Sequence, residues 1–328
     1  MNFFASDVFL GALASDFYRA TDFRFRTYTI SGHSVRLAEI NGKKPLVEGP
    51  FYDYVKPLPS HQGGDGDGHV RFIPKVVTST VLLDDRNPGM AWAPTGQEPA
   101  PLVAWARFPT WADYESFLHG RSKDMLKVMR KRRAKLAREH VAATYTFDDR
   151  NRGALELLCD WKRKQYQGGN ETLENPRAVA MLRHLFDDGN LLLATLKVGD
   201  RYVAIHAGFI WDNEYLALIP AFDPAFAQYG VGKQLLLYML QDSHQRGHSS
   251  FDFLQGAESY KFDFATHLQI IEPLGSPPLA YRVRRHAKTA TKAALLRISP
   301  RLFHGLKRTI LATRRLRHML NPRNRRSR

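Results

Sequence analysis

The sequence predicts an α+β protein whose mostly antiparallel sheet is flanked by helices. Three apolar, β-rich runs lie within residues 190–222, and two tight polar turns, "VGDR" and "WDNE", join them as hairpins. Helical patterns precede these strands at 153–167 and 176–189, and a further helix is expected from about Lys233 to Gln245. Hairpin-linked strands between helices favour this class over a doubly wound parallel sheet.

The first half of the chain is predicted to be richer in strands and loops. An opening helix is expected within residues 1–20. Three β-rich runs follow, at 23–30, 34–40 and 76–83. Residues 84–101 contain many turn-forming residues and are predicted to be a connection. Residues 111–140 then form one long helical stretch with nine Lys and Arg from Arg121 to Arg138, which either exposes a solvated face or borders an anionic ligand.

Composition limits the class of protein. The 328 residues are 44% hydrophobic, enough for two domains or a duplicated one. The single cysteine, Cys159, lies at helical spacing beside Leu155 and Leu158, so we expect a buried structural thiol. One cysteine allows no disulfide within the chain, which suits a reducing compartment. No apolar run reaches the roughly 18 to 20 residues that span a bilayer, so we expect a soluble or surface-bound cytoplasmic protein.

The positive charge is concentrated at the C-terminal end. The chain carries 48 Lys and Arg against 32 Asp and Glu, a formal net charge of +16. From Pro273 onward there are 16 Lys and Arg and no acidic residue, so the rest of the chain is neutral. Within residues 281–328 four apolar residues lie near one face of a basic amphipathic helix: Leu302, Leu306, Ile310 and Leu320. We expect this tail to bind an anionic membrane surface, with nucleic-acid binding or a solvated tail as alternatives.

Two glycines in the stretch "YGVGK" stand between the end of a strand and the start of a helix. At Gly230 and Gly232 the missing Cβ atoms let a ligand approach the backbone amides. The unpaired N–H groups of a first helical turn, with the helix dipole behind them, suit an anion such as a pyrophosphate. The third glycine of a dinucleotide fingerprint is absent, and "GxxxxGK[ST]" does not occur. The turn therefore indicates a diphosphate-bearing cofactor without naming it.

Ionisable side chains follow within "FDFLQGAESYK", residues 251–261. Asp252 lies on a strand with one face expected to be buried, where it is either a structural hydrogen-bond acceptor or a base with a tuned pKa. Just after this strand come a base, an acid and a cation: Glu258, Tyr260 and Lys261. As a set these groups are more specific than any one of them alone.

These motifs, in this order, resemble one known family. The segment 218–265 contains "YGVG", an apolar helix, "FDFLQG" and "YK", and is similar to the closing half of the CelD/BcsL-type acetyltransferase domain. That domain is part of the GNAT superfamily and is related to the FemAB peptidyltransferases. Segments 3–17 and 111–136 also resemble this group, so the resemblance covers nearly everything before about residue 275.

The resemblance implies acyl transfer from an acyl-CoA, such as acetyl-CoA, to an amine or hydroxyl. Two tandem GNAT-like halves would occupy residues 1–140 and 141–275, with the acyl-CoA site in the second, followed by the basic tail 276–328. The strand "EYLALIPA" would splay from the next strand, so that its free amides polarise the thioester carbonyl. The family's usual Gln or Arg three residues before the first glycine is here Ala227. The implied cofactor-binding residues are Pro220, Ala221, Gln228, Tyr229, Gly230, Val231, Gly232 and Lys233.

We expect the acceptor to attack the thioester directly, because Cys159 is far from these motifs in sequence and no "GxSxG" elbow is present. Asp252 or Glu258 is the candidate base, and His206, on the strand "YVAIHAGF", is a competing base or a histidine satisfied within the sheet. Tyr260 is the candidate acid. Lys261 would neutralise developing charge or hold an anionic substrate. No metal is expected.

The expected acceptor is a sugar, amino sugar or lipid-linked precursor in cell-envelope or exopolysaccharide assembly. Two alternatives remain from other classes. One is a non-catalytic protein of GNAT fold that binds membrane or nucleic acid through its tail. The other is a FemAB-like aminoacyl transferase, which would use an aminoacyl-tRNA in place of acyl-CoA.

Overall fold

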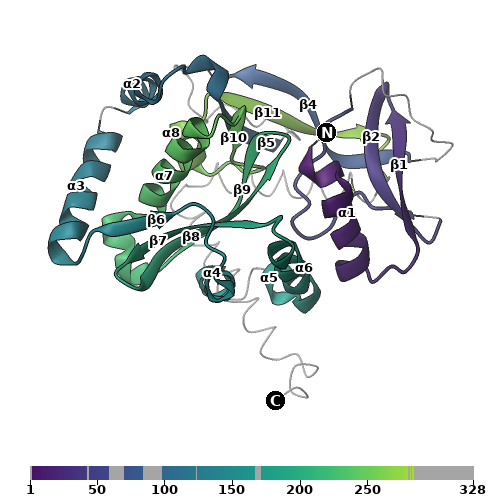
Figure 1. Ribbon diagram of the computed structural model, residues 1–328. Helices are drawn as coiled ribbons and strands as arrows, with labels where there is room; N and C mark the ends of the chain where they lie inside the picture. Colours follow the sequence, from purple (N-terminus) through teal and green to yellow (C-terminus); the bar gives the residue numbers. More distant parts are fainter. Residues whose placement is uncertain are drawn as a thin grey trace, which may run out of the picture.

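The structure is a computed structural model. It describes residues 2–42, 44–58, 70–83, 98–122, 124–166, 171–279, 281 and 283. A small sheet has the order β1-β2-β3, with β1 (Phe23–Ile30), β2 (His33–Ile40) and β3 (Lys44–Pro45). A large sheet has the order β4-β11-β5-β10-β9-β8-β7-β6 (Figure 1). Its strands are β4 (Phe72–Leu82), β5 (Glu98–Ala104), β6 (Ala143–Thr146), β7 (Leu192–Val198), β8 (Arg201–Trp211), β9 (Glu214–Phe222), β10 (Ser250–Asp252) and β11 (His267–Gly275).

Neighbouring strands of the large sheet are antiparallel except for β9 and β10, which are parallel. The predicted meander is confirmed as β7-β8-β9. Asp212 and Asn213, between β8 and β9, have φ of 51° and 61°, the backbone form that matches the twist of a tight hairpin. The mixed, mostly antiparallel fold class predicted from the sequence is therefore correct.

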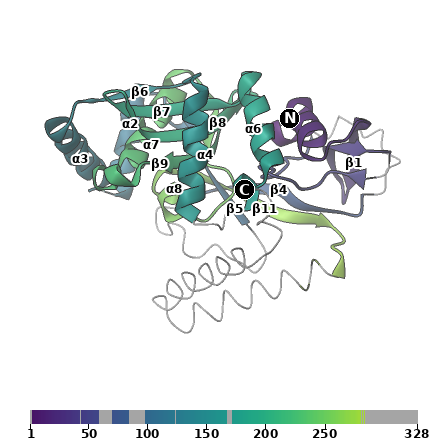
Figure 2. The same cartoon turned by 90° about the horizontal axis from the view of Figure 1, so that it is seen from below.

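Helices cover both faces of the large sheet. On one face α7 (Val231–Gln245) packs against β7, β8 and β9, with α8 (Ser259–Phe264), α2 (Trp111–Arg121) and α3 (Met125–Glu139) around it. On the other face lie α4 (Arg152–Tyr166) and α6 (Pro176–Asp187), as Figure 2 shows from below, with α5 (Glu171–Glu174) packed against both. α1 (Asp7–Ala12) packs against α6 and against β2 of the small sheet. Short helical turns complete the structure at Phe3–Ala5, Leu13–Phe17, Trp105–Arg107 and Pro224–Tyr229.

Alternation along the strands produces two cores. Leu193 and Ile205 point into the cluster that includes α4, whereas Ala194 and Leu196 join the cluster that includes α7. Cys159 on α4 is buried as predicted, and burial raises the pKa of its thiol to about 11. It is therefore a packing residue and not a nucleophile.

Two predictions for the first half were wrong in detail. The connection predicted at 84–101 ends earlier, because β5 begins at Glu98 and includes Pro99 and Pro101. Both prolines lie beside the chain that follows β10. Their carbonyls accept from the N–H groups of Gly256 and Phe253, each at 2.9 Å. Proline has no N–H to donate to a neighbouring strand. These two are tolerated within the sheet because, on the side that faces the chain after β10, only their carbonyls are used.

The helical stretch predicted at 111–140 is two helices. α2 ends at Arg121, and Ser122 adopts an extended backbone with φ −149° and ψ 93°, so α3 starts afresh at Met125. Thr110 and Asp113 form a capping box that fixes the start of α2. The break lets the basic helix α3 turn along the side of α7.

Strands from both sides of the predicted boundary at residue 140 share the large sheet. β5 lies between β10 and β11, and β4 forms the far edge. The division into tandem halves thus remains a prediction, with the two halves hydrogen bonded through one sheet. The tail from residue 284 onward lies outside the described residues, and so does its predicted amphipathic helix.

Candidate active site

The glycine turn leaves unpaired N–H groups at the start of α7, which is what an anion site requires. Gly230 is in the left-handed region, with φ 65° and ψ 35°, and follows the 3-10 turn Pro224–Tyr229. Its own N–H donates to the Ala227 carbonyl at 3.0 Å. The amides left for a ligand are those of the first helical turn: Val231, Gly232 and Lys233. No acidic side chain lies in this turn, so nothing there opposes the attraction of an anion to the helix dipole.

Strand β9 separates from β10 beside this turn. Their parallel pairing covers only three residues of β9, which are Glu214, Tyr215 and Leu216. From Ala217 onward β9 is paired with β8 alone, as far as Phe222. The short pairing is compatible with the splay that the resemblance implies, which stays a prediction. Pro220 and Ala221 lie in the part of β9 whose second edge has no strand partner among the described residues. Pro220 has no N–H, so any amide that this edge offers to a ligand belongs to another residue of 217–222.

Lys162 reaches this open edge from α4. Its Nζ donates to the Pro220 carbonyl at 2.9 Å. Burial lowers the pKa of the Lys162 ammonium to about 8, while Glu258 raises it and Lys261 lowers it further. Lys162 was not among the predicted site residues. The available signal was its position seven residues after the buried Leu155, which places a lysine on the apolar stripe of α4.

His206 approaches the same edge from β8, where it lies opposite Pro220 in the strand pair. The side chain is 6% exposed, and its Nδ1 is 3.1 Å from the Ala207 carbonyl oxygen. Burial, with contributions from Lys162 and Lys261, lowers the pKa of the imidazole to about 3. The ring is therefore neutral near pH 7 and is a weak proton acceptor.

Glu258 and Lys261 form an ion pair after the loop that follows β10. Glu258 Oε2 lies 3.2 Å from the Lys261 Nζ. The Lys261 ammonium is buried and also donates to the carbonyls of Leu254 at 3.3 Å and Gln255 at 3.0 Å. The Glu258 side chain is about half exposed, at 55%. Lys162, His206, Glu258 and Lys261 together are called the splay cluster below.

Helix α8 lies against the start of α7. Asp263 on α8 pairs with Lys233 on the first turn of α7 at 3.0 Å. Tyr260, also at α8, is half-buried against the aromatic core beneath α7. The Lys233 ammonium is thus engaged within the protein, which leaves its backbone N–H as the group for an anion. The helix that carries the "YK" pair therefore meets the first turn of α7 through Asp263.

Asp252 is fully buried and accepts three hydrogen bonds. The Tyr54 hydroxyl donates to Oδ2, the Leu254 N–H donates to Oδ1 at 2.7 Å, and Gln269 Nε2 donates to Oδ2 at 3.3 Å. Burial raises the pKa of the carboxyl to about 6, although Lys56 and the donors oppose this shift. Of the two predicted roles, this geometry favours the structural hydrogen-bond acceptor.

Two further residues position this loop from the N-terminal part of the chain. Besides Tyr54, the Asp53 carboxylate accepts from the Gln255 N–H, and burial raises the pKa of Asp53. Lys56 pairs with Glu214 at the start of β9 at 2.7 Å. Nothing in the stretch "YDYVK" distinguishes these residues from other polar positions, so sequence reasoning had no signal for them.

Gln228 and Tyr229, two predicted cofactor residues, contact α3 with their side chains. Lys135 Nζ lies 3.4 Å from Gln228 Oε1, and the Tyr229 hydroxyl donates to Glu139 at 2.6 Å. These contacts hold α3 beside the glycine turn. Most Lys and Arg of α3 are also exposed, so both roles predicted for this basic stretch stay open.

No group of three or more His, Cys, Asp or Glu side chains is placed to hold a metal ion within the described part of the chain. The site consists instead of backbone amides, a strand edge and the splay cluster. An acyl donor with a diphosphate fits this set. The first turn of α7 offers amides to the anion, and the open edge of β9 offers a place for the reacting carbonyl.

A comparison with protein families decides what this arrangement is similar to. Residues 123–262 match the model of the acetyltransferase (GNAT) domain. The match runs from α3 into α8, so it contains the glycine turn, the splay of β9 and all four members of the splay cluster. It supports the GNAT superfamily, whose domains generally use acyl-CoA and an acceptor. A search of curated proteins found no match.

Several solved structures are similar to the chain at low sequence identity. A conserved protein of unknown function from Bacteroides thetaiotaomicron VPI-5482 has 12% identity and a TM-score of 0.45, over 82% of this chain and 91% of that chain. The C-terminal domain of a putative lysylphosphatidylglycerol synthetase from Agrobacterium fabrum has 10% identity and a TM-score of 0.40, over 67% and 71%. L-PGS from Bacillus licheniformis has the same identity and TM-score, over 67% and 72%.

Proposed function

We propose that the chain transfers an acyl group from acyl-CoA, with acetyl-CoA as the donor, to an amine or hydroxyl. One observation carries this proposal: β9 has no pairing with β10 after Leu216, and its far end at Phe222 lies beside Gly232 in the turn whose left-handed Gly230 starts α7. A thioester and a diphosphate are the two groups that this pair of features would bind. The GNAT match over the same residues supports the assignment.

The donor would bind along β9. Its pyrophosphate would accept from the amides of Val231, Gly232 and Lys233, and its thioester would lie at the open edge near Pro220 and Ala221. Preorganised donors at such an edge stabilise the oxyanion that forms when the carbonyl is attacked. This stabilisation commonly lowers the barrier to acyl transfer more than any other single effect.

We assign the proton acceptor to Lys162. In its neutral form, the Lys162 amine takes the proton from the acceptor as the new C–N or C–O bond forms and the C–S bond breaks. The thiolate of CoA then receives a proton, for which Tyr260 is the candidate donor. Glu258 and Lys261 set the charge around Lys162. Asp252 positions the loop that carries Glu258, because its carboxylate accepts from the Leu254 N–H.

The resemblance to CelD/BcsL-type acetyltransferases supports a sugar, amino sugar or lipid-linked precursor as the acceptor, in cytoplasmic steps of envelope or exopolysaccharide assembly. The test is release of CoA thiol from acetyl-CoA by the purified full chain with a panel of such acceptors. Turnover with one acceptor class supports the proposal. Binding of acetyl-CoA without turnover on any acceptor would leave a non-catalytic GNAT scaffold. Transfer from aminoacyl-tRNA, without CoA release, would contradict the proposal and show that the chain is an aminoacyl transferase.

We also propose that the basic tail 281–328 attaches the enzyme to anionic membrane surfaces. Within the described residues no helix is long and apolar enough to cross a membrane. Sixteen Lys and Arg without an acidic residue from Pro273 onward support electrostatic attachment. Co-sedimentation with anionic vesicles, using the full chain and a chain ending at residue 280, tests it. Equal binding of the two chains would contradict membrane attachment, and preferential binding to nucleic acid would replace it.

A further inference from the structure

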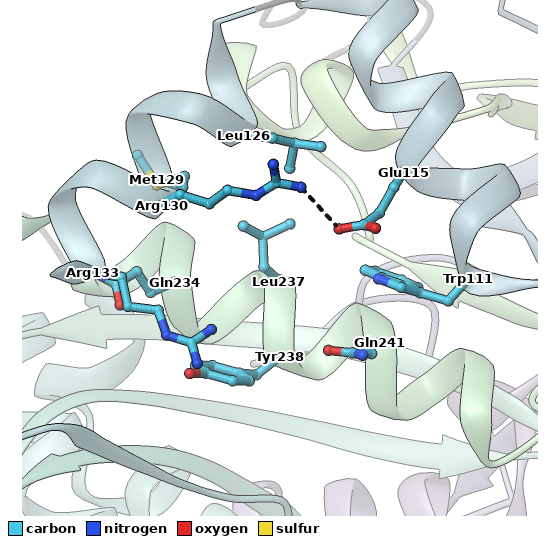
Figure 3. A pocket seen from close by; sticks show the side chains of 10 residues that line it. All are labelled: Trp111, Glu115, Leu126, Met129, Arg130, Arg133, Gln234, Leu237, Tyr238 and Gln241. Atoms are coloured by element: carbon cyan, nitrogen blue, oxygen red, sulfur yellow. Dashed lines mark ion pairs between the residues drawn. The ribbon is translucent and has the colours of Figure 1, made fainter.

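A pocket lies between α2, α3 and α7, on the side of α7 away from the sheet (Figure 3). Its volume is about 130 Å³, below the roughly 300–1,000 Å³ of pockets that enclose a whole ligand. It can therefore hold only one end of a larger molecule. We call it the α3–α7 pocket. The residues that matter for its chemistry are Trp111, Met129, Arg130, Arg133, Gln234 and Tyr238.

The α3–α7 pocket is lined by aromatic and aliphatic side chains together with two arginines, two glutamines and the carboxylate of Glu115. Trp111 and Tyr238 supply aromatic rings from α2 and α7, as Figure 3 shows. The Arg133 guanidinium lies 5.2 Å from the centroid of the Tyr238 ring. Among the described residues no carboxylate pairs with Arg133, and Arg130 has only a long contact of 3.8 Å with the exposed Glu115. Two guanidiniums are thus available to an anionic group.

Gln234 provides a second, independent sign of a ligand. This side chain is only 3% exposed and lines the pocket. Its Nε2 donates to the Tyr229 carbonyl at 2.8 Å. The other atom of the amide, Oε1, is therefore the acceptor whose partner has to be found. That oxygen is buried and has no hydrogen-bond partner. Buried acceptors in native proteins are nearly always satisfied, so this oxygen calls for a donor from a bound water or from a ligand in the pocket.

The α3–α7 pocket lies near the proposed pyrophosphate site along both of its helices. Gln234 follows Lys233 directly and lies within the first turns of α7. On the facing helix, Arg132 borders the glycine turn, since a Cβ built on Gly230 would lie 3.0 Å from its Nη1. Arg133 is the next residue and lines the pocket. Neighbouring arginines of α3 therefore face the glycine turn and the pocket.

We propose that the α3–α7 pocket binds the 3′-phosphoadenosine end of the acyl-CoA donor. This inference rests on the proposed function. An adenine ring stacks on aromatic side chains, and its amino group or a ribose hydroxyl supplies the donor that Gln234 Oε1 lacks. The 3′-phosphate pairs with Arg133 and Arg130, because guanidinium groups match phosphate geometry.

The test compares acetyl-CoA, 3′-dephospho-acetyl-CoA and adenosine 3′,5′-bisphosphate by calorimetry on the full chain. We expect acetyl-CoA to bind about tenfold more tightly than its dephospho form, and Arg133→Ala to remove that difference. Arg133→Ala should also weaken the binding of adenosine 3′,5′-bisphosphate by about tenfold. Arg138→Ala, an exposed arginine on the same helix outside the pocket, is the matched control and leaves all three affinities unchanged.

Failure of this inference and failure of the proposed function give different results. If acetyl-CoA is bound and cleaved but Arg133→Ala keeps the preference for the 3′-phosphate, the pocket assignment is wrong and the acyltransferase stands. If adenosine 3′,5′-bisphosphate binds through Arg133 while acetyl-CoA is not cleaved with any acceptor, the pocket is a nucleotide site and the acyltransferase proposal is wrong. If neither nucleotide binds, both are wrong.

Discussion

Lys162 combines two properties at one atom. Its Nζ is anchored to the Pro220 carbonyl at the open edge of β9, and the side chain is partly buried between α4 and the sheet. Burial then brings the pKa of its ammonium from 10.5 to about 8. A base is most effective when its pKa is near the working pH, because it is then both neutral and able to hold a proton.

The pH dependence of catalysis should follow Lys162. The protonated amine accepts no proton, so we expect kcat/KM to fall as pH decreases below about 8 and to level off above it. The Glu258 carboxylate stabilises the ammonium, so Glu258→Gln should lower the pKa of Lys162 and move the midpoint to lower pH. Steady-state rates of CoA release between pH 6 and about 10 measure both effects.

Lys162→Met keeps the length of the side chain and should lower kcat by about 100-fold or more. Lys164→Met is the matched control, because Lys164 is exposed on the same helix. If Glu258→Gln abolishes turnover at every pH while Lys162→Met retains it, the carboxylate base predicted from the sequence is correct and the lysine assignment is wrong.

Asp252 should couple stability to pH. Its folded-state pKa of about 6 exceeds its ordinary value of 3.8, so the folded chain favours the protonated carboxyl. The resulting stabilisation is complete below pH 3.8 and is lost as pH rises through 6. Relative to Asp252→Asn, the wild-type unfolding free energy should therefore fall by about 2 kcal/mol between pH 4.5 and 7.5. Urea unfolding of both proteins measures this difference, and a constant difference would show that the carboxyl does not titrate in this range.

At the scale of elements, the turn before α7 depends on a residue that only glycine fills without strain. Gly230→Ala should cost about 1 kcal/mol of stability, since its φ of 65° is unfavourable for alanine and the new Cβ meets Arg132. Displacing the first-turn amides should also raise KM for acetyl-CoA by about tenfold. Thermal unfolding and steady-state kinetics measure the two effects.

Gly247→Ala is the control at the other end of α7. Gly247 has a φ of 71° and no neighbouring atom within 4 Å of an added Cβ, so the same backbone strain arises without disturbing the turn. We expect a similar loss of stability and an unchanged KM. A rise in KM in both variants would mean that general loosening, rather than the glycine turn, controls donor binding.

Periodicity in the sequence was sufficient for the meander and the flanking helices, but β6, α8 and β11 were not predicted and two boundaries were wrong. The meander and the flanking helices follow directly from apolar spacing and turn residues. β5 was missed because Pro99 and Pro101 are usually strand breakers, and their tolerance depends on hydrogen bonds to a loop about 150 residues away. The break at Ser122 was missed because helical residues continue on both sides of it.

The candidate site was predictable to a similar degree. Local order along the chain identified the glycine turn, Glu258 and Lys261. Lys162 and Tyr54 could not be assigned to the site, because their roles arise only when α4 and the 52–56 segment meet the sheet. A spacing rule within one element contains no information on such contacts between distant segments.

For the whole molecule, the two halves are joined through the sheet and through the site. β10 has only three residues paired with β9, and its other neighbour is β5 from the N-terminal half. β11 lies between β5 and β4, both from that half. The buried Asp252 carboxylate depends on Tyr54 from the same part of the chain. The resemblance to tandem halves therefore does not by itself make them independent folding units.

Residues 141–275 alone should consequently fail to fold. Without β4 and β5, the strand β11 loses both of its neighbours, and buried residues such as Leu268 and Phe251 become exposed. We expect no cooperative thermal transition and no acetyl-CoA binding from this fragment, and recovery of both when residues 1–140 are co-expressed with it. Circular dichroism melts and calorimetry on the fragment, the reassembled pair and the full chain decide the question. A fragment that melts cooperatively and binds acetyl-CoA by itself would show instead that β4 and β5 were added to a complete domain.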